Sequence, residues 1–314
     1  MSRPVVLADP LPDEFLERLG DFEVVAIESD AETASDAVAV VSYGHPPVDA
    51  ALMDRLPNLK VISNHGVGVD HVDVAAATER KIPVGNTPGC LDASTADMTM
   101  ALMLSIARNV RIGDRFARGP EFTEYNPALL IGQEVTGSSL GIVGMGRIGT
   151  EVAKRAAGFD MEILYHNRNR LSDAIEKSLG AKYVELEDLL SECDFVSLNC
   201  PLTEETTGLI GVAQFALMKP TAMLINMARG PVVDTEALLI ALTAKQIAAA
   251  AIDVSDPEPL PRDHPLLSLD NLIITPHLGS ASNRTRQRMM EMTVENLHAG
   301  LAGQALPYPV NSIN

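Results

Sequence analysis

The first part of the chain alternates short apolar runs with segments in which apolar residues recur at helical spacing. Four apolar runs predict short strands with helices between them. These runs are Val5–Ala8, Val24–Ile27, Ala37–Tyr43 and Val61–Ser63. The pattern is typical of a small open α/β sheet.

A longer helix is predicted from Ser94 to Asn109. Apolar residues recur along it at helical spacing, namely Ala96, Met100, Met103, Leu104 and Ala107. The methionines could form a binding stripe, but we interpret them as core residues because Met commonly fills gaps in protein interiors.

The second part of the chain contains six short and nearly continuous apolar runs. They are Leu140–Val143, Glu162–Tyr165, Phe195–Asn199, Met223–Asn226, Ala249–Val254 and Leu272–Thr275. Such runs suit parallel strands that are buried on both faces. With helices between them, they predict a doubly wound nucleotide-binding sheet. No predicted strand follows the final helix, from Asn283 to Ala302. We therefore expect this helix to pack against the first part of the chain.

Composition narrows the class of protein. The chain of 314 residues is 46% hydrophobic and 21% charged, which is ordinary for a soluble protein with two domains. Its formal net charge of −18 argues against nucleic acid as a general partner. We expect no membrane partner, because no apolar run could span a bilayer and Met1–Pro10 lacks a signal-peptide pattern. The three cysteines lack a metal-binding spacing, which favours reduced thiols in the cytoplasm and no metal.

A glycine-rich turn carries the first chemical signal. Gly144-Met145-Gly146-Arg147-Ile148-Gly149 follows the strand Leu140–Val143 and opens a predicted helix from Arg147 to Ala157. In this context the glycines permit a tight turn, the approach of a pyrophosphate and close helix–strand packing. The helix N-terminus adds free N–H groups and partial positive charge. The alternative is an ordinary tight strand–helix turn.

The end of the next strand addresses which nicotinamide cofactor would bind. NAD sites usually place an acidic residue there for the ribose hydroxyls. This strand instead ends in His166-Asn167-Arg168-Asn169-Arg170, with two guanidiniums that could pair with a 2′-phosphate. We therefore predict that NADPH (NADP) is preferred. The alternative is that the arginines are merely solvated and NADH is used.

Three polar residues follow later strands, at the edge where open α/β sheets carry their sites. Arg229 follows Met223–Asn226, Glu258 follows the strand ending at Val254, and His277 follows the strand ending at Thr275. Arg229 could grip a carboxylate, His277 could donate a proton to a carbonyl oxygen, and Glu258 could orient the imidazole and keep it protonated. Taken singly, each could instead be a helix cap, a salt-bridge partner or a solvated loop residue.

Taken together, the motifs resemble the D-isomer-specific 2-hydroxyacid dehydrogenase family. VGMGRIG, CPLTEETTGLI, NMARGPVVD, AAIDVSDPEPLP and ITPHLGSAS match the motifs of that family in order and spacing over nearly the whole chain. The resemblance implies a Rossmann-type cofactor domain (residues 99–283) inserted in a smaller flavodoxin-like α/β substrate domain (residues 1–98 and 284–314). It also implies that Arg229, Glu258 and His277 are catalytic.

The resemblance further implies binding residues. The backbone N–H groups of Val67 and Gly68 would hold the substrate carboxylate with Arg229, while His65 and His71 in the same loop would be structural or solvated. The Gly66 and Gly68 spacing by itself suggests exposed amides in an anion nest. The residues implied to contact the cofactor are Thr95, Gly144, Gly146, Arg147, Ile148, Asn167, Arg168, Cys200, Pro201, Thr206, Met227, Ala228, Asp253, His277 and Gly279.

Within the family, the sequence is most similar to glyoxylate/hydroxypyruvate reductases, as DPEPLPRDHPLL and PHLGSASNRTRQRM indicate. The missing acid at His166-Asn167 departs from relatives that use NAD. Two alternatives remain: a hydroxyphenylpyruvate or phenylpyruvate reductase with the same catalytic residues, or a non-catalytic NAD(P)-sensing protein. The resemblance also implies a homodimer, with Ser94–Asn109 and the apolar loop Phe116–Gly132 at the interface.

Overall fold

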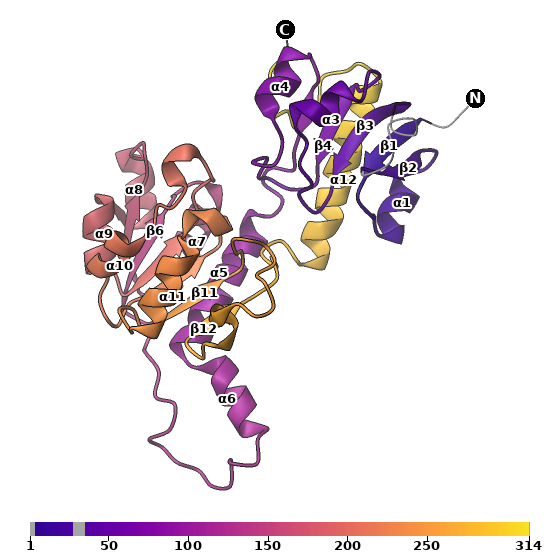
Figure 1. Cartoon of the computed structure of the whole chain (residues 1–314). Coiled ribbons are helices and arrows are strands. Elements are labelled where there is room, and N and C mark those ends of the chain that lie inside the picture. The colour runs from indigo at the N-terminus through magenta and orange to yellow at the C-terminus, as the bar shows by residue number, and fades with distance from the viewer. Residues whose placement is uncertain (1–3, 28–34, 314) are drawn as a thin grey trace. The chain divides into compact units, whose positions relative to one another are not determined.

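The computed structural model describes residues 4–27 and 35–313 (Figure 1). The chain divides into two compact units, Met1–Leu91 with Ser282–Asn314, and Asp92–Ala281. Both divisions lie earlier in the chain than the boundaries expected after residues 98 and 283. The first differs because α5 (Asp92–Ala107) is one continuous helix that packs on α7 and the strands of the second unit.

The first unit contains a parallel sheet with the strand order β2-β1-β3-β4-β5. Its strands are β1 (Val5–Ala8), β2 (Glu23–Ala26), β3 (Ala37–Ser42), β4 (Val61–Asn64) and β5 (Val84–Gly85). Its helices are α1 (Asp13–Leu19), α3 (Ala50–Asp54), α4 (Val74–Glu79) and α12 (Asn283–Leu301). The four predicted strands are confirmed. The expected return of the last helix is also confirmed, since α12 packs on β3, β4 and α1.

The second unit contains a seven-stranded parallel sheet with the order β12-β11-β10-β9-β6-β7-β8. Its strands are β6 (Ser139–Val143), β7 (Glu162–His166), β8 (Ala181–Tyr183), β9 (Phe195–Leu198), β10 (Met223–Asn226), β11 (Ala249–Ile252) and β12 (Leu272–Ile274). All six predicted strands are present. The strand order reverses between β6 and β9, so the glycine turn after β6 lies at a topological switch point, where such sheets bind ligands.

Helices cover both faces of this second sheet. They are α7 (Arg147–Ala156), α8 (Asp173–Leu179), α9 (Leu186–Glu192), α10 (Val212–Leu217) and α11 (Thr235–Thr243), together with α5. The helix α6 (Val110–Ala117) follows α5 and buries none of its residues. Short 3₁₀ turns are η1 (Ala157–Phe159), η2 (Glu204–Thr206), η3 (Gly230–Val232) and η4 (Pro265–Ser268). The predicted helix from Ser94 to Asn109 ends earlier, at Ala107, and Asn109 adopts a left-handed φ of 52° before α6 begins.

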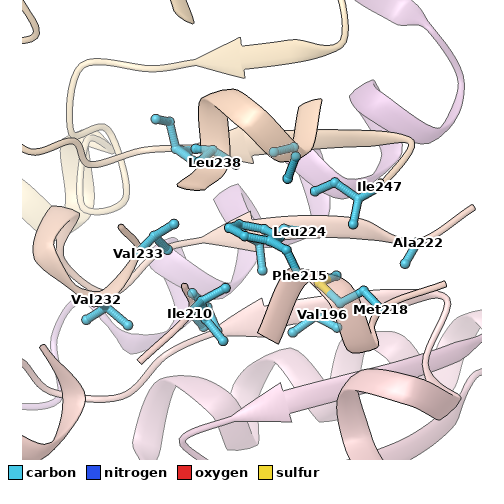
Figure 2. Close-up of a cluster of buried hydrophobic side chains, with 14 of the residues drawn as sticks. Val196, Ile210, Phe215, Met218, Ala222, Leu224, Val232, Val233, Leu238 and Ile247 are labelled. Carbon is cyan, nitrogen blue, oxygen red and sulfur yellow. The ribbon is translucent and has the colours of Figure 1, made fainter. Parts of the chain in front are cut away.

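Alternation along the strands builds one apolar core on each face. On β10, Leu224 packs in the core beneath α9, α10 and α11, while Ile225 packs in the core beneath α5 and α7. Figure 2 shows the first of these cores, where Phe215 and Leu238 meet Leu224. Each fully buried side chain of this size contributes roughly 1.5–3 kcal/mol to stability. Met100 and Met103 lie in the second core, which confirms their interpretation as packing residues.

None of the helices in the described part of the chain is long and apolar enough to cross a bilayer.

Candidate functional site

The three candidate catalytic residues follow three neighbouring strands of the second unit. Arg229 follows β10, Glu258 follows β11 and His277 follows β12, and these strands are paired in that order. The Nδ1 atom of His277 lies 3.0 Å from Oε1 of Glu258, within hydrogen-bonding distance. The two side chains are 29% and 39% exposed, so both can meet a ligand. Arg229 Nη1 donates to the carbonyl oxygen of Ala228 at 2.9 Å.

The loop that carries His277 is held by the carboxylate of Asp253. Thr275 Oγ1 and the N–H of Leu278 donate to Asp253 Oδ1 at 2.6 and 2.7 Å, and the N–H of Gly279 donates to Oδ2 at 2.7 Å. His277 itself has a left-handed φ of 56°, a conformation that costs roughly 1–3 kcal/mol in a non-glycine residue. These hydrogen bonds to a buried acid therefore support a strained backbone.

Sequence reasoning missed this anchoring role of Asp253. The resemblance implied only a contact between Asp253 and the nicotinamide. The one sequence signal was an acid directly after the buried strand Ala249–Ile252, where an unpaired carboxylate would be costly.

Four of the residues expected to contact the cofactor lie together in the second unit. A Cβ atom added at Gly279 would lie 3.2 Å from Met227 Cε, 3.3 Å from Asp253 Oδ2 and 3.3 Å from Thr95 Cγ2. Ser94 Oγ also donates to the Gly279 carbonyl oxygen at 2.9 Å. A side chain at position 279 would therefore fill the space that these residues surround.

The glycine turn has the shape that a pyrophosphate requires. Gly144 has a φ of +95°, and a Cβ there would lie 2.5 Å from the backbone nitrogen of Cys200. Gly149 packs against the Gly144 carbonyl. A Cβ at Gly146 would meet no atom within 4 Å, and no side chain caps the N-terminus of α7. The first N–H groups of α7 are thus left for an anion, so the residues present fit a dinucleotide.

Two neighbours of this turn have additional partners. Arg147 Nε donates to Asp92 Oδ2 at 2.8 Å, and Ile148 is partly buried in the core beneath α5 and α7. Asn167, at the end of β7, accepts a hydrogen bond from the N–H of Met145 at 2.6 Å. Asn167 therefore ties the end of β7 to the glycine turn.

The two arginines after β7 differ in their surroundings. Arg168 is exposed and makes no hydrogen bond or ion pair within the described residues. Arg170 instead donates to both carboxylate oxygens of Glu176, at 2.8 and 2.7 Å. Tyr165 OH donates to the same carboxylate at 2.6 Å, and these hydrogen bonds lower the pKa of Glu176 to about 2. The expectation that both guanidiniums are available for a phosphate is therefore wrong for Arg170.

Cys200, Pro201 and Thr206, also expected to contact the cofactor, form a second small cluster. Thr206 Oγ1 donates to the Pro201 carbonyl oxygen at 2.7 Å and accepts from the N–H of Thr203 at 2.8 Å. Cys200 is buried, which raises the pKa of its thiol to about 11. The cysteine is therefore a protonated packing residue beside the glycine turn.

Val67 and Gly68 lie in the first unit, in the loop after β4. In the same unit, burial lowers the pKa of His65 to about 3, with help from the charges of Arg286 and His45. His65 Nδ1 lies 3.2 Å from Thr293 Oγ1. His65 is thus a neutral, hydrogen-bonded residue. Within residues 4–27 and 35–313, no group of three or more His, Cys, Asp or Glu could hold a metal ion.

Comparison with known proteins gives consistent matches. The family described as D-isomer specific 2-hydroxyacid dehydrogenase, NAD binding domain, matches residues 100–279. The chain is 48% identical over 281 residues to a glyoxylate reductase of Korarchaeum cryptofilum, covering 89% of this chain and 84% of that protein. It is 42% identical over 324 aligned residues to a glyoxylate reductase of Pyrococcus furiosus, covering 99% and 96%.

Two solved structures extend this similarity to the fold. The TT0316 protein of Thermus thermophilus superimposes with a TM-score of 0.90 at 44% identity, covering 98% of this chain and 100% of that chain. An NADPH-dependent glyoxylate/hydroxypyruvate reductase of Sinorhizobium meliloti, in complex with NADP and malonate, gives a TM-score of 0.89 at 32% identity, covering 98% and 97%.

Proposed function

Because the chain belongs to the D-isomer-specific 2-hydroxyacid dehydrogenase family, we propose that it reduces glyoxylate and hydroxypyruvate with NADPH. Family membership makes it an oxidoreductase that uses a nicotinamide cofactor and interconverts 2-oxo and 2-hydroxy acids. The proposal adds the small substrates, the phosphorylated cofactor and the roles of individual residues.

The contact of His277 Nδ1 with Glu258 Oε1 at 3.0 Å carries the catalytic part of the proposal. A carboxylate at Nδ1 fixes the orientation of the imidazole. His277 Nε2 would then donate the proton to the carbonyl oxygen of the substrate. Arg229 would bind the substrate carboxylate and polarise the adjacent carbonyl. The bound nicotinamide supplies the hydride.

The exposed guanidinium of Arg168 supports the choice of cofactor. The two acids at the start of α8 both lie beside Arg170: Glu176 accepts two hydrogen bonds from it, and Asp173 Oδ1 lies 3.6 Å from its Nη2 atom. We assign the 2′-phosphate to Arg168, the ribose end to Asn167, and the pyrophosphate to Gly144, Gly146, Arg147 and Ile148. NADH would then bind more weakly, since it lacks the group that Arg168 recognises.

The remaining expected contacts complete the proposed site. Cys200, Pro201 and Thr206 would line the adenosine, and Thr95, Met227, Ala228, Asp253 and Gly279 would line the nicotinamide. The N–H groups of Val67 and Gly68 would bind the substrate carboxylate. We further propose a cytoplasmic homodimer; the thiols of Cys193 and Cys200, which form no disulfide, fit a reducing compartment.

Substitution of the proposed proton donor tests the catalytic assignment. The His277→Ala variant should lose roughly 10²–10⁴-fold in kcat for glyoxylate, because general acid catalysis contributes about that factor. The Kd for NADPH, measured by fluorescence titration, should change little. The matched control is His298→Ala on α12, whose ring packs against Phe22 and should leave kcat unaltered. Wild-type turnover in His277→Ala would refute the role of His277.

A further inference from the structure

The loop after β4 is held in place through its carbonyl oxygens. Asn64 Nδ2 donates to the carbonyl oxygens of Gly66 and Gly68 at 3.0 and 2.9 Å. Asn86 Nδ2 donates to the carbonyl oxygen of Val67, which lies between them, at 2.9 Å. Three consecutive carbonyl groups are therefore bound by two side-chain amides.

This arrangement fixes the direction of the N–H groups. In a trans peptide the C=O and N–H bonds of one unit point in opposite directions, and these peptides are trans. The Val67 N–H shares its peptide with the Gly66 carbonyl, and the Gly68 N–H shares its peptide with the Val67 carbonyl. Both N–H groups therefore point away from the asparagines. Neither makes a hydrogen bond within the described residues.

Asn64 is itself held in one orientation. It is 1% exposed, and its Nδ2 faces two carbonyl oxygens, which can only accept. Its Oδ1 must then face His71 Nε2, which lies 3.0 Å away. An amide oxygen can only accept, so His71 must carry its hydrogen on Nε2. Ser42 Oγ, at the end of β3, lies 2.8 Å from the same nitrogen.

We infer that Asn64, oriented by His71 and Ser42, is a positioning residue that aims the Val67 N–H group at the substrate carboxylate, beside the Gly68 N–H group whose peptide Asn86 holds. The inference rests on the proposed function, which places the carboxylate at these two N–H groups. Asn64 does not touch the substrate; it acts by holding the peptides. The role also gives His71 a purpose that does not involve proton transfer to the substrate.

Removing the side-chain amide of Asn64 tests the inference. In Asn64→Ala the loop loses the two hydrogen bonds that the side-chain amide donates to its carbonyl oxygens. The peptides can then rotate, and their N–H groups no longer keep one direction. The KM for glyoxylate should rise about tenfold, the factor that corresponds to about 1.4 kcal/mol. The kcat and the Kd for NADPH should change much less, because the interaction is made before and during the reaction alike.

A matched control separates this effect from a general loss of stability. Asn311 in the same unit accepts from the Val84 N–H at 2.8 Å and donates to the Ile82 carbonyl at 3.0 Å, and makes no hydrogen bond to the loop within the described residues. Asn311→Ala should lower the thermal midpoint without raising the KM. If both variants raise the KM equally, or if Asn64→Ala leaves it unchanged, Asn64 does not position the loop.

Two further measurements keep the test decisive. Should Asn64→Ala fail to fold, His71→Phe keeps an aromatic ring but removes the Nε2 hydrogen, and it should raise the KM in the same direction. Titration of the ¹⁵N-labelled chain with oxamate should shift the amide signals of Val67 and Gly68 in the wild type, and much less in the variant. Wild-type shifts without glyoxylate turnover would contradict the proposed function alone; no wild-type shifts would overturn this inference.

Discussion

Arg168 and Arg170 show how two identical side chains close together in the sequence can have different tasks. Arg170 and Tyr165 both donate hydrogen bonds to the carboxylate of Glu176, and these bonds connect α8 to the end of β7. A bidentate pair of this kind is a strong and directional interaction. Arg168 takes no part in it and presents its charge to solvent. We therefore assign the proposed recognition of a 2′-phosphate to Arg168 alone, in a loop that Arg170 stabilises.

The Arg168→Ala variant should therefore discriminate between the two cofactors. Loss of a charge-assisted hydrogen bond costs about 1.5–3 kcal/mol, so the KM for NADPH should rise roughly tenfold to a hundredfold. The KM for NADH should change little, because NADH has no 2′-phosphate. Arg118→Ala, which removes an exposed arginine paired with Asp114, serves as the control and should alter neither value. An equal rise in the KM for NADPH and for NADH in Arg168→Ala would show that Arg168 does not bind the 2′-phosphate.

At the scale of elements, the site depends on the connection between β12 and α12. This loop has no regular structure of its own and holds His277 in a left-handed conformation. Its order comes from hydrogen bonds to Asp253, which stands at the end of the neighbouring strand β11. The position of the imidazole is thus set by a residue from a different strand.

Replacing Asp253 with Asn should loosen this loop. The new NH₂ group would face either the Gly279 N–H or the two donors at the other oxygen, and a buried donor without an acceptor costs about 1–3 kcal/mol. We expect Asp253→Asn to lower the free energy of unfolding in urea by about that amount and to reduce kcat. The exposed Asp263→Asn change should stay within about 0.5 kcal/mol of wild type. Unchanged stability in Asp253→Asn would show that the loop does not need this anchor.

Nearly continuous apolar runs made most of the strands predictable from the sequence. The missed strands are short. β8 (Ala181–Tyr183) has a lysine at its centre, and β5 has only two residues, of which Gly85 bridges to the distant Pro309. The break between α5 and α6 carries neither Gly nor Pro, so the left-handed Asn109 was the only local signal for it, and Asn is a weaker signal than Gly. These features depend on partners that are distant in sequence.

The sequence located the candidate catalytic residues but not the side-chain interactions around the site. The strand-end rule located Arg229, Glu258 and His277, because polar residues after buried strands are conspicuous in the sequence. The engagement of Arg170 by Glu176 was not predictable, since both lie in a polar segment where either could be solvated. The orientation of Asn64 also required the fold, because it depends on Ser42 from the adjacent strand.

At the scale of the whole molecule, the second unit has an apolar surface that is exposed to solvent in a single chain. After α6 the chain runs out as a long loop before β6 (Figure 1). Phe122, Tyr125 and Ile131 in this loop are 50%, 82% and 78% exposed. A pocket of about 290 Å³ lies beside its end, lined in part by Ile106, Ile112 and Ile131. Exposed apolar groups of this kind favour burial against a second chain.

The proposed homodimer can be tested by charging this surface. Analytical ultracentrifugation of the wild type at micromolar concentration should give the mass of two chains. Ile131→Asp places a charge among apolar groups that the interface would bury, so it should shift the equilibrium towards one chain. Val212→Asp, at a comparably exposed valine on α10, is the control and should leave the mass unchanged. A wild type that sediments as a single chain would refute the dimer.

The most direct test of the account is kcat/KM for glyoxylate, hydroxypyruvate and phenylpyruvate, each with NADPH and with NADH, followed by nicotinamide absorbance. The account predicts the highest values for glyoxylate and hydroxypyruvate with NADPH. A preference for phenylpyruvate, or equal use of NADH, would contradict the proposed substrate or cofactor. The absence of turnover with every pair would contradict catalysis itself and favour a protein that only binds the cofactor.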